Sequence, residues 1–283
     1  MQRYNTITAA PIAGSLGAEI TGVSLSENLP DDVVAEIRQA LLDHLVIFFR
    51  GQDLSPQQQI AFARRFGPLE QHDFVKGMSD YPEIIRVVRE ADETTKNFGG
   101  SWHCDVTHQR CPALGSVLYA VDVPPFGGDT LFANQYLAYE TLSPGMQRML
   151  QGLTGIHTAR GPFAPEGRSK SNWKNMEVQT SDKAYEEMEH PVVRTHPETG
   201  RKLLFVNRTF TVRFKEMTEQ ESAPLLEYLF RHASDERFTC RFRWSQGAVA
   251  FWDNRAVLHH AVGDYSGYRR EMRRVAISGD RPV

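Results

Sequence analysis

Short β-rich runs separated by turn-forming residues dominate the chain beyond Gly67-Pro68. Val, Ile, Phe, Tyr and Trp are frequent within these runs, whereas Gly, Pro, Asn and Asp stand between them and favour turns. The runs are Glu83–Val88, Ser116–Val121, Thr130–Ala133, Val192–Thr195, Leu203–Val206, Phe238–Trp244, Ala248–Trp252 and Met272–Ser278. So many short strands predict a β-sandwich or barrel, because each strand must bury one face against another layer.

Helical patterns occur in a few segments that flank these strands. Each expected helix start carries a residue suited to cap a helix. The expected starts are Asp31 as an N-cap, Ser55-Pro56, Ser143-Pro144 and the capping box Thr218-x-x-Glu221. The first helix leads into a buried strand at Leu45–Phe49. We therefore expect a mainly β fold with flanking helices, arranged as a sandwich or jelly roll.

The length and composition of the chain bound its domain organisation. With 283 residues, of which 41% are hydrophobic, the chain can bury one large core, and we predict a single domain over residues 1–283. The polar stretch from about Thr158 to Glu189 is too long for a simple connection between strands. We expect a lid or substrate loop at residues 158–189.

Charge and motif content exclude several classes of protein. The formal net charge is −3, and no stretch concentrates Lys and Arg among aromatic residues, so we expect no nucleic-acid partner. No apolar run has the length of a membrane span, and the N-terminal residues lack the apolar segment of a signal peptide. The cysteines form no Cys-x-x-Cys pair, which suits a reduced compartment. We expect a cytoplasmic protein without a membrane partner. Walker, Gly-x-Gly-x-x-Gly and Gly-x-Ser-x-Gly motifs are also absent, which disfavours nucleotide binding and serine hydrolysis.

His103 and Asp105 are the clearest candidates for chemistry. They are two positions apart, so on a strand their side chains point to one face and can share a cation, while Cys104 points toward the core. Two donors leave a metal ion short of protein ligands, and His259 or His260 can supply the third. Two histidines and one carboxylate form the facial triad of non-haem Fe(II) oxygenases.

Four arginines close to one another follow these histidines. Strand alternation sends Arg270 and Arg274 to one face and Arg269 and Arg273 to the other, so we expect one pair to be functional and the other solvated. A guanidinium beside a metal site can help to hold a dicarboxylate, because one end chelates the ion and the other makes a forked, charge-assisted pair. Arg270 is the candidate for that role.

Taken together, these residues resemble the taurine dioxygenase and 2,4-D dioxygenase family of 2-oxoglutarate-dependent oxygenases. The resemblance covers nearly the whole chain and consists of several motifs in the order of the family. They are Leu16–Ile20, Phe66-Gly67, Trp102-His103-x-Asp105-Val106-Thr107, Gly127-Gly128-Asp129-Thr130, His190–Pro197, Trp252-Asp253-Asn254-Arg255 and His259. Cys104 is a departure, because the family usually carries threonine or serine there.

The resemblance implies a double-stranded β-helix with Fe(II) held by His103, Asp105 and His259, a choice that the family spacing makes between the two candidate histidines. It also implies that Arg270 anchors 2-oxoglutarate with help from the Thr130 hydroxyl. The implied reaction consumes O2 and 2-oxoglutarate, hydroxylates a substrate, and releases succinate and CO2. Beyond the metal ligands, no further catalytic residue is expected.

The resemblance also suggests the kind of substrate. In the sulfonate-oxidising members, substrate is bound at positions that match four residues of this chain, namely His72, Phe163, Phe210 and Arg274. A small organic anion is therefore expected, either a taurine-like sulfonate or a sulfate ester. Val75 and Gly99 stand where those members carry tyrosine and asparagine, which argues against taurine itself. An aryloxyalkanoate or another carboxylate is the alternative, because Thr239–Trp244 and Tyr81–Glu83 resemble that branch of the family.

Two hypotheses from other classes remain at this point. A zinc or other metallohydrolase could use the same three ligands, but it leaves Arg270 and Thr130 without a role. A metal-free binding or structural jelly roll would need none of these residues for chemistry. The resemblance further suggests a homo-oligomer, either a dimer or a tetramer.

Overall fold

A large sheet spans most of the chain. The computed structural model describes residues 4–94, 97–167 and 173–283, and its largest sheet has eight strands in the order β1-β2-β3-β14-β6-β16-β4, with β5 also paired to β16. Only β2 and β3 run parallel among these pairs. The strands are β1 (Thr8–Pro11), β2 (Ala18–Thr21), β3 (Val46–Phe49), β4 (Leu69–Glu70), β5 (Ile84–Arg89), β6 (Gly115–Asp122), β14 (Val249–Asp253) and β16 (Arg270–Ile277).

Smaller sheets form the opposing layer. Three strands pair in the order β13-β7-β15, three more in the order β12-β8-β9, and β10 pairs with β11, all of them antiparallel. These strands are β7 (Thr130–Asn134), β8 (Thr154–His157), β9 (Met188–Pro191), β10 (Val193–Thr195), β11 (Lys202–Leu204), β12 (Thr211–Phe214), β13 (Thr239–Phe242) and β15 (Val257–Ala261). The architecture is mainly β, as the sequence predicts.

Strand alternation divides the core into two parts. In β14, Ala250 and Trp252 face the space between the sheets, whereas Val249 and Phe251 face the helices on the outer side of the large sheet. Because successive side chains on a strand point to opposite faces, β14 is buried on both sides. The part of the core that contains Ala250 and Trp252 lies between the sheets. The strands around it therefore also direct some polar side chains into this space.

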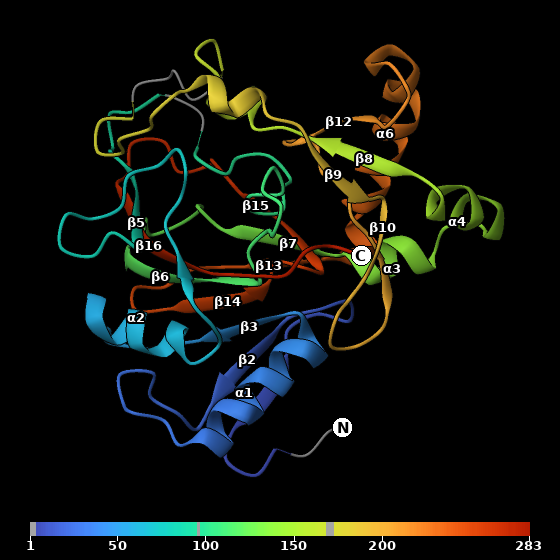
Figure 1. Ribbon diagram of the computed structural model, residues 1–283. Coiled ribbons are helices and arrows are strands. Elements are labelled where there is room, and N and C mark those ends of the chain that lie inside the picture. The colour runs from blue at the N-terminus through green and yellow to red at the C-terminus, as the bar shows by residue number, and fades with distance from the viewer. Residues whose placement is uncertain (1–3, 95–96, 168–172) are drawn as a thin grey trace.

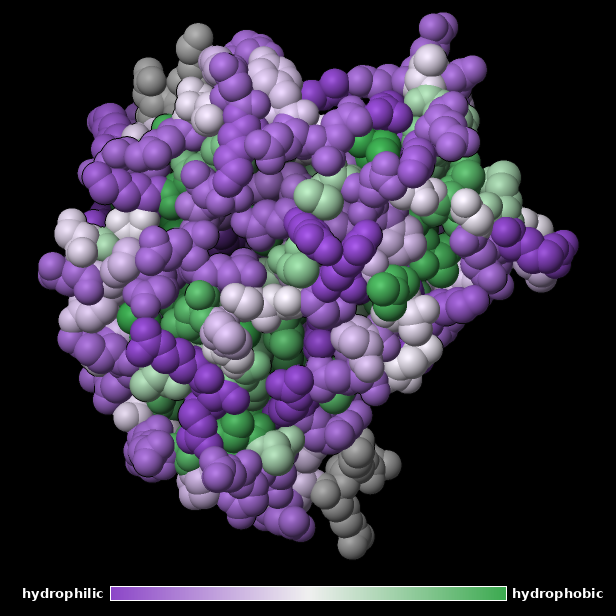
Figure 2. Space-filling view, viewed as in Figure 1, coloured by the Kyte–Doolittle hydropathy of each residue, from purple (hydrophilic) through white to green (hydrophobic). Residues whose placement is uncertain are grey.

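Helices cover the sheets from outside. Figure 1 shows α1 and α2 beneath β3 and β14, where they pack against the large sheet. The helices are α1 (Asp31–His44), α2 (Pro56–Arg64), α3 (Gln135–Glu140), α4 (Pro144–Gln151), α5 (Arg160–Phe163) and α6 (Glu219–Ala233), with short 3-10 turns η2 (Asp182–Tyr185) and η3 (Glu236–Phe238). Among the described residues, no helix combines the length and the apolar character needed to cross a bilayer. The face seen in Figure 2 is mostly hydrophilic, with separate hydrophobic areas between polar side chains.

Several local predictions need correction. Asp31 is not the N-cap of the first helix: Pro30 holds that position in an extended conformation, and Asp31 lies in the first turn, where its negative charge favours the helix N-terminus. The run Val192–Thr195 forms strand β10, which begins one residue later, at Val193, because Val192 separates it from β9. Strands β1, β2, β4, β8, β9, β12 and β15 did not appear among the runs expected from the sequence.

The stretch predicted as a lid has local structure where it is described. It includes α5 and η2, and Val178 forms a β-bridge with Val75. In Figure 1 its yellow segments run along the side of the molecule opposite α1 and α2. Residues 168–172 of this stretch lie outside the described residues, and the lid role of residues 158–189 stays a prediction.

Candidate active site

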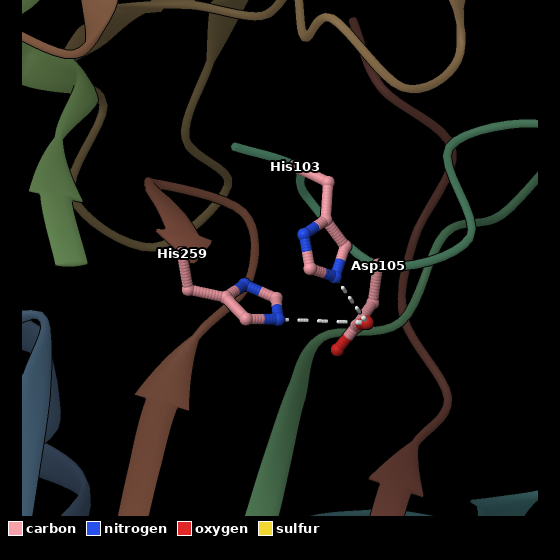
Figure 3. A group of neighbouring side chains, drawn as sticks. All are labelled: His103, Asp105 and His259. Carbon is pink, nitrogen blue, oxygen red and sulfur yellow. Dashed lines mark ion pairs between the residues drawn. The ribbon is translucent and has the colours of Figure 1, made fainter. Parts of the chain in front are cut away.

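Three buried side chains converge between the two layers. The Nε2 atoms of His103 and His259 each lie 3.7 Å from Asp105 Oδ1, and one donor atom from each residue falls within 4.8 Å of the others (Figure 3). His259 belongs to β15, and its backbone exchanges two hydrogen bonds with His103, so the two rings lie side by side. His260, on the opposite face of β15, packs against Trp102 instead. The structure therefore brings together the three predicted ligands and leaves out the competing histidine.

The local backbone at Asp105 differs from the expected strand. His103 forms an isolated β-bridge with His259, but a turn begins at Asp105, and Val106 has a positive φ of 49°. The side chains of His103 and Asp105 still reach the same space, because the turn directs the Asp105 carboxylate toward the histidines. Cys104 faces the core, as predicted, and its thiol donates to the Asn254 carbonyl.

The protonation states of the triad suit a cation. Burial lowers the pKa of His103 and His259, so both rings are neutral near neutral pH. His103 Nδ1 donates to the Ser101 carbonyl at 2.8 Å, which leaves the Nε2 lone pair directed at the cluster. Burial alone would raise the pKa of Asp105, but the guanidinium of Arg274, 2.6 Å away, holds it well below its usual range. Two neutral imidazoles and one carboxylate form the donor set that fits Fe(II).

A second buried cation, Arg270, lies at the start of β16, the strand that also carries Arg274. Arg270 is only 5% exposed, and its Nε and Nη2 atoms have no hydrogen-bond partner among the described residues. Its guanidinium lies between the rings of Trp244 and Tyr265, about 6 Å from each centroid. A buried guanidinium with free donors is unfavourable by itself and fits a carboxylate ligand.

Thr130 lies on the same inner face as the metal cluster. It is two residues from Phe132 on β7, and Phe132 pairs with His259 on β15, so alternation directs both Thr130 and His259 inward. Its hydroxyl oxygen accepts a hydrogen bond from the indole of Trp244. The hydroxyl proton remains available to an acceptor inside the site.

The predicted substrate residues also gather near the triad. His72 packs against Phe163, with ring centroids 5.3 Å apart, and Phe163 stacks on Phe74. Phe210 belongs to the same hydrophobic cluster. Burial, followed by the charge of Arg274, lowers the pKa of His72 to about 3. His72 is therefore neutral, and since its Nδ1 accepts from the Phe74 amide, its Nε2 carries the proton.

Sequence reasoning missed residues around this site. Ser116 and Asn254 contact Asp105 directly, and Trp244 contacts Thr130. Asn254 was part of a recognised motif but had no assigned role, whereas Ser116 resembled an ordinary strand residue. Phe74 gave no signal, because an aromatic residue in a loop does not reveal where it packs.

Comparisons with known proteins agree with this geometry. The sequence pattern described as "Taurine catabolism dioxygenase TauD, TfdA family" matches residues 8–276. The chain is 37% identical to an alpha-ketoglutarate-dependent sulfate ester dioxygenase of Pseudomonas putida, over 96% of this chain and 90% of that protein. It is 35% identical to the alpha-ketoglutarate-dependent 2,4-dichlorophenoxyacetate dioxygenase of Cupriavidus pinatubonensis, over 98% and 100% respectively.

The fold has a close counterpart among solved structures. A crystal structure of a taurine dioxygenase from Burkholderia xenovorans superposes with a TM-score of 0.82 at 37% identity, covering 98% of this chain and 93% of that one. This likeness confirms the double-stranded β-helix, or jelly roll, with flanking helices that the sequence predicted.

Proposed function

The chain belongs to the taurine catabolism dioxygenase TauD, TfdA family, and we propose that it oxidises a small organic anion at an Fe(II) ion held by His103, Asp105 and His259. Its reaction class is that of a 2-oxoglutarate-dependent dioxygenase, which consumes 2-oxoglutarate and O2 and releases succinate and CO2. Iron bound in such a site supplies the O2 chemistry that oxidises a substrate C–H bond.

One observation carries the proposal above all others. The described residues contain both a buried triad of metal donors and Arg270, a buried cation whose Nε and Nη2 lack partners there. In the proposed role, Arg270 forms a forked pair with the remote carboxylate of 2-oxoglutarate, and the Thr130 hydroxyl donates to the same group. A metallohydrolase would leave Arg270 and Thr130 without a role, and a metal-free binding protein would leave the buried triad without one.

Arg274 and His72 are proposed to bind the substrate anion. Arg274 retains an unpartnered Nε among the described residues, and His72 presents a protonated Nε2 in its neutral form. A neutral donor beside a cation suits a sulfonate or sulfate ester, whose oxygens accept several hydrogen bonds. The same residues hold the reacting carbon near the metal and keep water from it.

The apolar wall of the pocket favours a substrate with an apolar body. Phe74, Val75, Phe163, Met176 and Phe210 form one buried cluster on this side of the site. A surface pocket lined by His72 and Val75 opens beside it. Taurine is disfavoured because Val75 and Gly99 stand where the sulfonate-oxidising members carry tyrosine and asparagine. An alkyl sulfate or longer sulfonate is the first choice, and an aryloxyalkanoate or another carboxylate is the second.

Two further parts of the proposal concern assembly and location. We propose a homo-oligomer, either a dimer or a tetramer, acting in the cytoplasm without nucleic-acid or membrane partners. Native mass spectrometry of the purified protein would measure the oligomeric state directly, and a monomer would contradict this part alone.

The decisive experiment measures succinate release by Fe(II)-loaded protein supplied with 2-oxoglutarate and O2. The panel contains taurine, longer alkylsulfonates, alkyl sulfates and aryloxyalkanoates, each compared with a blank without substrate. We expect alkyl sulfates or longer sulfonates to stimulate turnover most. Stimulation by aryloxyalkanoates alone would select the second choice, whereas turnover without 2-oxoglutarate or O2 would favour a hydrolase.

A further inference from the structure

The two oxygens of the Asp105 carboxylate have different surroundings. Oδ1 lies 3.7 Å from both histidine Nε2 atoms and also accepts a hydrogen bond of 2.6 Å from Arg274 Nη1. Oδ2 accepts a hydrogen bond of 3.0 Å from the hydroxyl of Ser116, a fully buried residue near the start of β6. Because Ser116 binds only Oδ2, it holds that oxygen away from the histidines, while Oδ1 stays toward them and Arg274.

The backbone of Asp105 is held separately by Asn254. The Asn254 side chain accepts from the Asp105 amide at 2.8 Å and donates to the Asp105 carbonyl at 3.1 Å. The side-chain amide of Asn254 also donates to the Ala113 carbonyl, and the backbone amide of Asn254 donates to the Leu114 carbonyl. Asn254 is 1% exposed, so these bonds do not compete with bulk water.

Backbone strain next to Asp105 explains why such support is needed. Val106 has a φ of 49°, a region that a β-branched residue rarely occupies because its side chain crowds the backbone. Without fixed partners, the turn would relax toward an extended conformation and carry the Asp105 carboxylate with it. The hydrogen bonds from Asn254 oppose that relaxation at both the backbone amide and the backbone carbonyl of Asp105.

We infer that Ser116 and Asn254 are positioning residues that preassemble the metal site, Ser116 by orienting the Asp105 carboxylate and Asn254 by holding its strained backbone. The inference rests on the proposed role of the triad as metal ligands. It explains how the triad keeps its geometry before any ion binds. Neither residue supplies a donor atom to the triad, so each acts on the site through Asp105.

The test measures metal affinity of the full-length protein under anaerobic conditions, with Co(II) and Fe(II) as the probes. Ser116→Ala removes only the hydroxyl, and we expect the Kd for metal to rise about 10- to 100-fold, as is typical when a hydrogen bond to a metal ligand is lost. Ser222→Ala is the matched control, because Ser222 is also fully buried and donates to a backbone carbonyl, but it lies in α6 away from the triad.

The readouts separate positioning from general stability. We expect the melting temperature of metal-free Ser116→Ala to fall no further than that of Ser222→Ala, which also leaves the Phe214 amide without its acceptor, while only Ser116→Ala loses metal affinity. For Asn254→Ala, we expect faster amide hydrogen exchange at Asp105 together with weaker metal binding, whereas Ser116→Ala should leave that exchange unchanged. Metal affinity equal to wild type in both variants would overturn the inference.

A third variant, His103→Ala, distinguishes failure of the positioning role from failure of the proposed metal site. His103→Ala should abolish stoichiometric metal binding by the otherwise intact protein. If wild type binds metal and His103→Ala does not, normal affinity in Ser116→Ala rejects the positioning role alone. If His103→Ala binds as tightly as wild type, the triad assignment itself is wrong, and the inference falls with it.

Discussion

The indole N–H of Trp244 donates to the Thr130 hydroxyl oxygen at 3.0 Å, and both side chains are buried beside Arg270. Since Trp244 is a donor only, the Thr130 oxygen is the acceptor in this bond. The hydroxyl proton must then point elsewhere, and the proposed carboxylate of 2-oxoglutarate is the acceptor it would meet. Trp244 thereby orients a group that is proposed to bind the cosubstrate.

Trp244→Phe should weaken 2-oxoglutarate binding about 3- to 10-fold, because the loss of one hydrogen bond lets the Thr130 hydroxyl rotate. Isothermal titration calorimetry without O2 would measure the affinity. Thr130→Val provides the second arm of a double-mutant cycle. If Trp244 acts through Thr130, adding Trp244→Phe to Thr130→Val should change little further. Fully additive losses would contradict this relationship.

Gly128→Ala should displace Arg270 and weaken 2-oxoglutarate binding about tenfold or more. A Cβ at Gly128 would lie 3.2 Å from Arg270 Cδ and 3.3 Å from its Nε, closer than normal packing allows. Gly267→Ala is the matched control, because Gly267 also has a positive φ of 85° but has nothing within 4 Å of an added Cβ. Both variants should lose about 1 kcal/mol of stability from backbone strain. Equal cosubstrate affinity in the two would argue against the close approach.

Arg270→Ala and Arg274→Ala should affect different ligands. Arg270→Ala removes the proposed anchor and should reduce 2-oxoglutarate affinity on the order of 100-fold, as expected for a buried charge pair. Arg274→Ala should raise the substrate KM strongly while sparing slow turnover of 2-oxoglutarate without substrate. Steady-state kinetics with both ligands varied would separate the effects. A similar loss of 2-oxoglutarate affinity in both variants would refute the division of roles.

The sequence predicts the identity of the triad better than its geometry. The spacing of His103 and Asp105 is a local signal, and it can be recognised in the sequence alone together with His259 in a later motif. The turn at Asp105 is different, because Val106 adopts a positive φ that its residue type disfavours. The side chain of Asn254, 149 positions away from Asp105, accepts from the Asp105 amide and so helps to hold that turn.

The fold shows the same division between local and distant information. Runs such as Ala248–Trp252 are apolar enough to predict a buried strand, and β14 confirms this prediction. Strands β8 and β12 were missed because they are short, half polar and stabilised by pairing with each other. Similarly, the wall formed by Phe74, Phe163 and Phe210 assembles from three separate segments. No periodicity in one segment can reveal such a cluster.

Acid should destabilise the protein through its buried histidines. Burial lowers the pKa of His190 from 6.5 to about 4 and also lowers the pKa of His157 well below its usual value. His190 Nε2 donates to the carbonyls of Thr107 and Gln109, while its Nδ1 is buried without a partner among the described residues. A second proton would therefore enter a site that offers no acceptor.

The sign of the pH effect follows from the lowered pKa of His190. The unfolded chain takes up the proton near pH 6.5, whereas the folded protein resists it until about pH 4. Stability is thus fully present above pH 6.5 and is lost as the pH falls toward 4. Between about pH 7.5 and about pH 5, His190 alone should remove about 2 kcal/mol from the free energy of unfolding.

Denaturant unfolding of wild type and His190→Gln across this range would measure the effect. Glutamine keeps an N–H donor for the carbonyls of Thr107 and Gln109 but cannot take up a proton. We expect His190→Gln to be less stable than wild type near neutral pH, because its shape fits the site less well, and to lose less stability on acidification. The two curves should converge as the pH falls. Parallel curves would show that His190 is not the group whose protonation destabilises the fold.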